Sequence, residues 1–177
     1  MSEPRFAFAY AEMAAVAEHV RKTRAEGDPA LVEAGRFTAD EAADRLRIAT
    51  AVASDWRHFA EMELPPVEGA TDREKIAMLE TILSGARSRR DVALRAVESE
   101  YGATVANLPL SELWDIHEAH DPRSLRILPY LHWESYAAAI EAMLWWQMKP
   151  RDQGRRMVTM INIDMRSSRA LQPRAAA

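Results

Sequence analysis

The sequence contains no cysteine and only 6 glycines among its 177 residues. The absence of cysteine excludes disulfides, thiolate metal sites and cysteine nucleophiles, and it fits a reducing cytoplasm, where we expect this protein. So few glycines leave little chance of a backbone loop that cradles phosphate, and the motifs GxSxG and HExxH are both missing. The sequence therefore favours a protein without catalytic activity and without a cofactor, while catalysis stays open as an alternative.

Long apolar segments are missing as well. No run of residues approaches the roughly 18 apolar residues that a membrane-spanning helix needs, and residues 1–13 lack the apolar core of a signal peptide. With 48% hydrophobic and 28% charged residues, the chain has the composition of one compact domain with an ordinary core. We therefore expect a soluble protein with no membrane partner.

The net charge of -4 is divided unequally along the chain. Residues 149–177 hold 7 basic and 2 acidic residues and carry +5, which leaves -9 on residues 1–148. A basic tail on an acidic body can bind an acidic partner, bind nucleic acid, or fold back on its own domain. We therefore divide the chain into a helical domain, residues 1–149, and a basic strand or extended arm, residues 150–177, which either joins the same compact unit or docks a partner.

Helical spacing of apolar residues covers most of the body and predicts a mainly α-helical bundle. The four major helices are expected over residues 4–25, 38–63, 71–101 and 130–148, with short helical segments over residues 30–34 and 110–120. Gly27 and Pro29 are expected to end the first helix, and Gly102 the third. Thr71 and Glu74 have the spacing of a capping box at the start of the third helix.

Residues 155–166, RRMVTMINIDMR, change from helical spacing to the period-two alternation of a strand. One face of that strand would carry Met157, Thr159, Ile161, Ile163 and Met165. A strand needs a partner strand for its backbone groups, and the candidates are residues 103–108, the same segment of another copy, or a different protein. With Arg155, Arg156 and Arg166 around it, this face is the predicted partner-binding site.

Trp146 is a further candidate for partner binding. It is adjacent to Trp145 in the last predicted helix, so the two side chains point about 100 degrees apart. One ring can therefore leave the buried stripe, and an exposed tryptophan is a common anchor of a protein interface. Burial of both rings in a helix that is covered on most sides is the favoured alternative.

Arginine side chains form a second candidate site, for nucleic acid. The residues are Arg87, Arg89, Arg90, Arg151 and Arg169. The first three share a predicted helix with Glu80 and Asp91, so a solvated helix face with ion pairs is the simpler interpretation. Nucleic-acid binding stays an alternative function of the chain.

The segment LWDIHEAHD contains the third candidate, a metal site. His117 and His120 are three residues apart in a predicted short helix, which places both on one face, and Asp115 is close to them in sequence. A catalytic metal needs three or more protein ligands, so the set would require a ligand from elsewhere. A metal-dependent hydrolase centred on these residues is the second alternative function.

Residues 31–56, LVEAGRFTADEAADRLRIATAVASDW, resemble a pattern in small uncharacterised α-helical proteins of phages and prophages. In that pattern a short helix ends in Ala-Gly-Arg and a long amphipathic helix follows. The resemblance implies mobile-element biology and assigns no activity or functional residue. The leading hypothesis is a non-catalytic helical protein that binds another protein or its own copy and regulates or inhibits a macromolecular complex.

Overall fold

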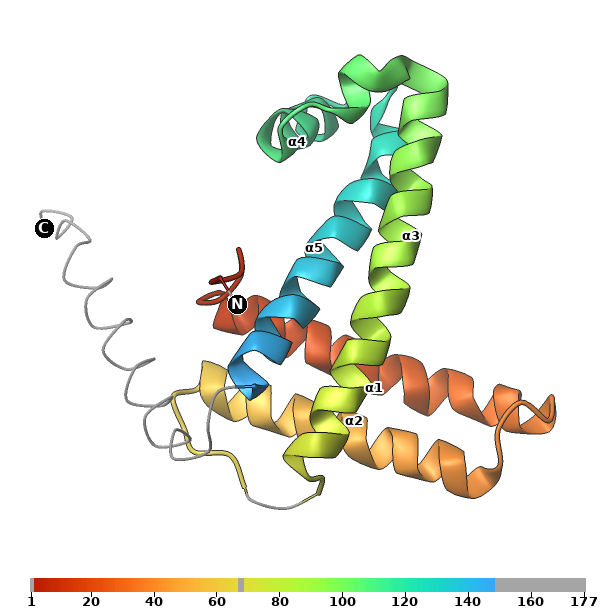
Figure 1. The fold of residues 1–177 in the computed structure, drawn as a ribbon, viewed down its shortest axis with the longest axis vertical. Helices are drawn as coiled ribbons and strands as arrows, with labels where there is room; N and C mark the ends of the chain where they lie inside the picture. The colour runs from red at the N-terminus through yellow and green to blue at the C-terminus, as the bar shows by residue number, and fades with distance from the viewer. Residues whose placement is uncertain (1, 67–68, 149–177) are drawn as a thin grey trace, which may run out of the picture.

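The computed structural model describes residues 2–66 and 69–148, which fold into five α-helices without a strand (Figure 1). The helices are α1 (Tyr10–Glu33), α2 (Ala39–Ala60), α3 (Asp72–Ala106), α4 (Leu110–Glu118) and α5 (Ser124–Gln147). The predicted mainly α-helical fold is confirmed. The predicted strand over residues 155–166 lies outside the described residues.

The helices are arranged as two antiparallel pairs that cross each other (Figure 1). We call the pair α1 and α2 the hairpin, and the pair α3 and α5 the arm. The beginning of α3 and the end of α5 pack on the hairpin, while the other ends of both helices project beyond it. The short helix α4 folds against the projecting end of the arm.

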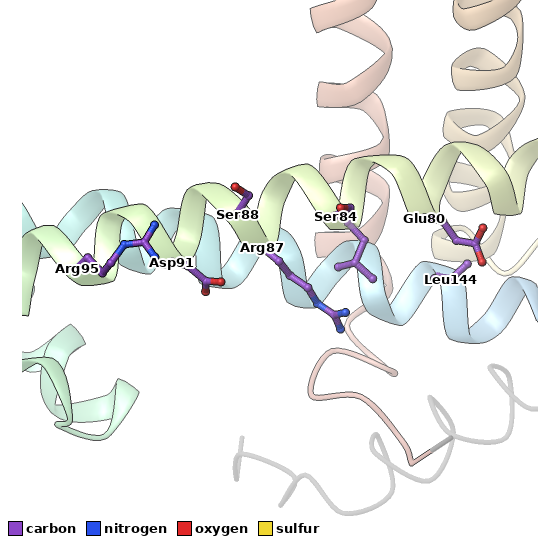
Figure 2. A pocket seen from close by; sticks show the side chains of 8 residues that line it. Glu80, Ser84, Arg87, Ser88, Asp91, Arg95 and Leu144 are labelled. Atoms are coloured by element: carbon purple, nitrogen blue, oxygen red, sulfur yellow. The ribbon is translucent and has the colours of Figure 1, made fainter.

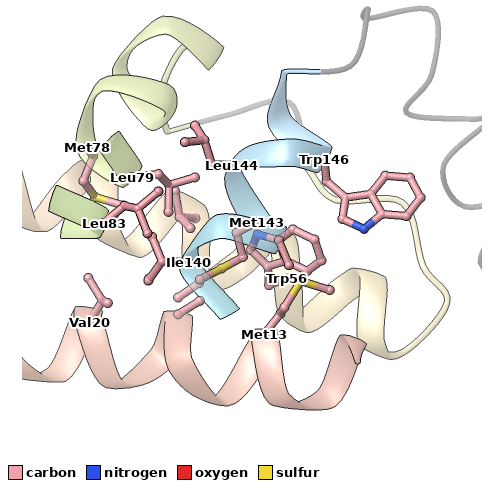
Figure 3. Packing of buried hydrophobic residues seen from close by; sticks show 14 of the residues in the cluster. Met13, Val20, Trp56, Met78, Leu79, Leu83, Ile140, Met143, Leu144 and Trp146 are labelled. Carbon is pink, nitrogen blue, oxygen red and sulfur yellow. The ribbon is translucent and has the colours of Figure 1, made fainter. Parts of the chain in front are cut away.

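The main core lies where the arm crosses the hairpin (Figure 3). Both pairs contribute large side chains that are at most 1% exposed: Met13, Trp56, Leu79, Ile140 and Met143. Burying side chains of this size stabilises a fold by roughly 1.5–3 kcal/mol each relative to exposed ones. This core therefore fixes the arm on the hairpin.

A second, smaller core lies at the far end of the arm. It is built from Val97 of α3, Leu113 of α4, and Ile127 and Leu131 of α5, each of which is at most 1% exposed. These four side chains hold α4 against the arm without help from the hairpin. The projecting end of the arm is thus an ordered part of the molecule with its own packing.

The first helix is longer than predicted. It passes through Gly27 and Pro29 and ends at Glu33, so the separate short helix expected over residues 30–34 is part of α1. The end of α1 is held by tertiary contacts, since the buried carboxylate of Asp28 binds the Arg45 guanidinium of α2 at 3.0 Å. Such contacts offset the low helix propensity of glycine and proline.

Gly102 interrupts the third helix but does not end it. Its backbone has φ 81 and ψ 166, outside the helical region, and helical structure resumes up to Ala106. Residues 103–106 are therefore not the strand or loop that was expected, and they offer no partner strand to residues 155–166. The last helix also begins earlier than predicted, at Ser124. This earlier start places Ile127 in the small core, where it is fully buried.

The capping box at Thr71 and Glu74 is confirmed. The Thr71 hydroxyl accepts the backbone N–H of Glu74, and the Glu74 carboxylate accepts the backbone N–H of Thr71 at 2.6 Å. These hydrogen bonds, together with an ion pair to Arg47 of α2, lower the pKa of Glu74 to about 2. The start of α3 is therefore tied to the hairpin through one carboxylate.

A buried ion pair also joins the arm to the hairpin. Lys75 Nζ of α3 lies 2.5 Å from Asp55 Oδ2 of α2, and the two side chains are only 7% and 9% exposed. Burial raises the pKa of the Asp55 carboxyl, while the hydrogen bond from Lys75 opposes that rise. Removing one member would leave the other charge buried without its partner.

We expect Lys75→Met to lower the free energy of unfolding by about 3–5 kcal/mol at neutral pH, because it leaves the Asp55 carboxylate buried alone. The double variant D55L/K75M should recover most of that loss, since two apolar side chains replace the pair. Urea unfolding followed by circular dichroism measures both values. Equal losses in the single and double variants would contradict this account of the pair.

The capping carboxylate predicts a dependence of stability on pH. Because the pKa of Glu74 is about 2 in the folded chain against 4.5 ordinarily, its charged form stabilises the fold above pH 4.5, and this contribution falls as the pH drops toward 2. Glu74→Gln keeps the hydrogen-bond acceptor but cannot titrate. The difference in unfolding free energy between the wild type and Glu74→Gln should therefore shrink from pH 6 to pH 3, whereas a constant difference would refute the assignment.

Candidate functional site

Most of the predicted partner-binding site lies outside the described residues. This holds for Arg155, Arg156, Met157, Thr159, Ile161, Ile163, Met165 and Arg166, and also for Arg151 and Arg169 of the nucleic-acid candidate. The structure places the remaining candidates, which are Trp146, three arginines of α3 and the residues around α4.

Trp146 lies in the main core and not on the surface (Figure 3). Its side chain is 3% exposed, and its indole Nε1 donates a hydrogen bond to the carbonyl oxygen of Ala7 at 2.6 Å. The ring also meets Phe8 edge to face, with 6.3 Å between the ring centroids. The segment before α1 thus covers the end of α5, and the exposed tryptophan that the sequence suggested here is absent at this position.

The predicted metal ligands are not brought together. His117 Nδ1 lies 2.6 Å from Ser124 Oγ, whereas His120 follows the end of α4 with φ 55 and directs Nδ1 to the Glu118 carbonyl oxygen. Asp115 is on the exposed side of α4. Within residues 2–66 and 69–148, no three histidine, aspartate or glutamate side chains lie close enough to hold a metal ion.

Each of the three arginines on α3 has a partner on the protein. Arg87 pairs with Glu141 of α5 at 2.9 Å, and Arg90 pairs with Asp91 at 2.8 Å. The Arg89 guanidinium lies over the Trp133 ring, 4.8 Å from its centroid. These contacts match the simpler interpretation, in which the arginines belong to a solvated helix face with ion pairs.

An open groove of about 580 Å³ runs along α3 beside α5 (Figure 2). Its lining consists of Glu80, Leu83, Ser84, Arg87, Ser88, Asp91, Arg95 and Leu144. Two carboxylates and two guanidiniums balance one another along the groove, so its charge favours neither an anion nor a cation. The lining also holds no histidine or cysteine.

Among the described residues, three of the eight large apolar side chains that are exposed lie on α4 and at the start of α5. Trp114 of α4 is 38% exposed, and Leu125 and Leu128 of α5 are 87% and 40% exposed. Trp114 contacts His117 with 5.7 Å between ring centroids, and His117 contacts Ser124, which lies one turn before Leu128. We call Trp114, Leu125 and Leu128 the tip face.

Exposed acidic side chains also lie on α4. We call Glu112, Asp115 and Glu118 the acidic rim; all three are exposed on α4, which carries no lysine or arginine. None of these carboxylates pairs with a basic side chain in the described part of the chain. Glu118 lies one helical turn after Trp114 and therefore on the same side of α4, whereas Glu112, two positions before Trp114, lies on the opposite side. The carboxylate of Glu118 is thus the part of the rim that shares a side of α4 with the tip face.

The same surface continues along α5 toward the hairpin. His132 follows Leu128 by one turn, and its ring stacks on Tyr136 at 6.3 Å between centroids. Tyr136 in turn meets His19 of α1 edge to face at 6.1 Å. Ring contacts of His132, Tyr136 and His19 therefore join α5 to α1.

Comparison of the chain with protein families, with curated proteins and with solved structures gave no match in any of the three. Among the described helices, none combines the length and the apolar character needed to cross a membrane.

We expect the tip face and the small core behind it to respond differently to substitution. Leu113→Ala should destabilise the packing of α4 by about 2–5 kcal/mol, because it leaves a cavity in the small core. Trp114→Ala should cost less than Leu113→Ala, because Trp114 is 38% exposed whereas Leu113 is 1% exposed. Hydrogen exchange of the α4 amides measures both effects, and equal loss of protection would show that Trp114 is a packing residue.

Proposed function

We propose that the protein is a non-catalytic binding protein that engages a segment of another protein at the tip face. The observation that carries this proposal is that Trp114 of α4 and Leu125 and Leu128 of α5 are exposed on the two helices that meet at the small core. Large apolar groups gathered on one surface are typical of protein interfaces, while single exposed apolar residues are not informative.

The packing behind the tip face supports this function. Leu113 precedes Trp114 in α4 and is fully buried in the small core, and Ile127 precedes Leu128 in α5 and is buried in the same core. The exposed side chains thus extend from two helices whose positions are already fixed. A surface that is ordered before binding loses less conformational entropy when a partner arrives.

The acidic rim indicates the chemistry of the partner. An apolar segment flanked by lysine or arginine would place its apolar side chains on Trp114 and Leu128 and its charges near Asp115 and Glu118. Pairs of this kind at the edge of an interface add mainly orientation and association rate. The apolar anchor would supply most of the affinity.

The fold also bears on the predicted strand over residues 155–166. Residues 2–66 and 69–148 contain no strand, so they offer none with which that segment could pair. This supports the part of the proposal in which the tail adds to a partner's sheet or exchanges between copies. The described arginines give less support to nucleic-acid binding, because Arg87 and Arg90 are already neutralised by carboxylates.

We further propose that the protein comes from a phage or another mobile element and regulates or inhibits a macromolecular complex. The support for this part is the resemblance of residues 31–56, which form the end of α1, the turn after it and most of α2. A small, non-catalytic chain that binds its partner through one surface suits such a role.

Selection of random peptides displayed on a surface tests the proposed function without knowledge of the partner. With the full chain as bait, we expect enrichment of peptides that combine aromatic or aliphatic residues with lysine or arginine. These peptides should bind the variant W114A/L128S at least about 10-fold more weakly, which corresponds to about 1.4 kcal/mol. Fluorescence anisotropy with labelled peptides measures the affinities.

Val92→Ser is the matched control for that selection. Val92 is 57% exposed on α3, outside the tip face, so its loss should leave the selected peptides bound as before. Circular dichroism of both variants checks that the helices are intact. Selected peptides that bind W114A/L128S as tightly as the wild type would rule out the tip face as the docking surface.

A further inference from the structure

We infer that a second site, at the point where α1, α3 and α5 diverge from the main core, binds a single nucleotide through its phosphate group. We call the three residues at its centre, Arg24 of α1, Arg89 of α3 and Tyr136 of α5, the crossing site. None of them belongs to the tip face, and the ligand is a small molecule. The inference therefore goes beyond the proposed function, which concerns a protein partner.

The crossing site lies at the edge of the main core. Arg24 follows the buried Val20 by one turn of α1, and Tyr136 precedes the buried Ile140 by one turn of α5. On α3, Arg89 comes three residues after the last side chain that is buried in this core. Arg24 and Tyr136 are half-buried and Arg89 is exposed. Where the arm leaves the hairpin (Figure 1), polar and charged groups therefore follow the apolar side chains on all three helices.

Ring contacts join the same three helices. The Tyr136 ring meets Trp133 of α5 and His19 of α1 edge to face, with 5.6 and 6.1 Å between ring centroids. His132 stacks on Tyr136 at 6.3 Å. The Arg89 guanidinium lies over the Trp133 ring, 4.8 Å from its centroid. The rings of α5 thus connect Arg89 of α3 with α1.

Both guanidiniums of the crossing site act on the Tyr136 hydroxyl. Burial raises the pKa of this hydroxyl, and the charges of Arg24 and Arg89 oppose the rise. Because the effect of a charge falls off with distance, both guanidiniums lie near the hydroxyl although they belong to different helices. A phosphate placed beside Tyr136 would therefore meet two positive charges and a hydroxyl that can donate a hydrogen bond.

Neither guanidinium forms an ion pair within the described part of the chain. Arg24 Nη1 donates a hydrogen bond to the Arg45 carbonyl oxygen at 2.8 Å. Asp28 also attracts Arg24, yet its two oxygens accept hydrogen bonds from Arg45 at 3.0 and 3.4 Å. Burial, followed by the charge of Arg45, lowers the pKa of Arg24. A phosphate would balance this partly desolvated charge, and guanidiniums bind phosphate oxygens with good geometry.

Exposed rings beside the crossing site suit a planar base. His19 and His132 are both exposed, and each contacts Tyr136. Bases stack on aromatic and histidine side chains, and every base has a flat face for such a contact. A ligand that joins one phosphate to a planar aromatic group, as a nucleotide does, matches both parts of the site.

The charges around the site favour a single nucleotide over a strand of nucleic acid. A strand needs a positive track for its successive phosphates. On α3, however, Arg87 pairs with Glu141 and Arg90 pairs with Asp91, so the uncompensated charge does not continue along the helix beside Arg89. The crossing site therefore fits one phosphate group.

Isothermal titration calorimetry of the full chain with AMP, GMP, CMP and UMP tests the crossing site. At least one of these nucleotides should bind with a dissociation constant of about 1 mM or below. Its nucleoside, which lacks the phosphate, and ribose 5-phosphate, which lacks the base, should each bind at least about 10-fold more weakly. Absence of saturation with all of the nucleotides, or a nucleoside that binds as tightly as its nucleotide, would overturn the inference.

Substitution of single arginines locates the ligand. Arg89→Gln should weaken binding of the nucleotide at least about 10-fold, because it removes one of the two positive charges at the phosphate. Arg24→Gln should act in the same way, with circular dichroism to check the fold. Arg87→Gln is the matched control, since it removes the same charge from an exposed, ion-paired position of α3, and it should change the affinity by less than about 2-fold. Equal weakening by Arg87→Gln and Arg89→Gln would show a non-specific effect of net charge and refute the site.

Two further measurements separate the crossing site from the tip face and from nucleic-acid binding. The variant W114A/L128S should bind the nucleotide as the wild type does, so the inference and the proposed function can fail independently. A single-stranded octanucleotide should bind less than about 10-fold more tightly than the nucleotide. Loss of nucleotide binding in W114A/L128S would place the ligand at the tip face, and a larger gain with the strand that disappears at high salt would indicate nucleic acid. Either result would overturn the inference.

Discussion

The length of the arm is the constraint on which the other features depend. The 30 residues of α3 before the break at Gly102 span about 45 Å, which is more than the hairpin can cover where the two pairs cross. The remaining turns of α3 and α5 have to bury their apolar sides against each other and against α4. They are buried in the small core. The same packing leaves Trp114 and Leu128 facing outward at a fixed position.

Local signals in the sequence predicted the helices better than their ends. The capping box at Thr71 was correctly predicted because it depends on residues three positions apart. The continuation of α1 through Pro29 was missed because it depends on Asp28 meeting Arg45 of another helix. The start of α5 before Pro129 was missed for the same reason, since packing in the small core outweighs the cost of proline in the first turns.

The candidate site shows the limit of periodicity as a guide to exposure. The sequence offered Trp146 as an exposed anchor, yet the segment before α1 covers it, and the exposed tryptophan is Trp114. Leu125 and Leu128 lie in a stretch where no helix was predicted, so no face could be assigned to them. Their exposure depends on where α4 packs. The apolar pattern within one helix carries no information about that position.

The break at Gly102 marks the point where the chain leaves the straight part of α3. Residues 103–123 leave one helix of the arm and return to the other, so they form an elaborated connection between two antiparallel helices. A different connection could be grafted onto the same arm without disturbing its junction with the hairpin. Residues 103–123 are therefore an exchangeable insert, whose replacement would change the end of the arm and leave the main core in place.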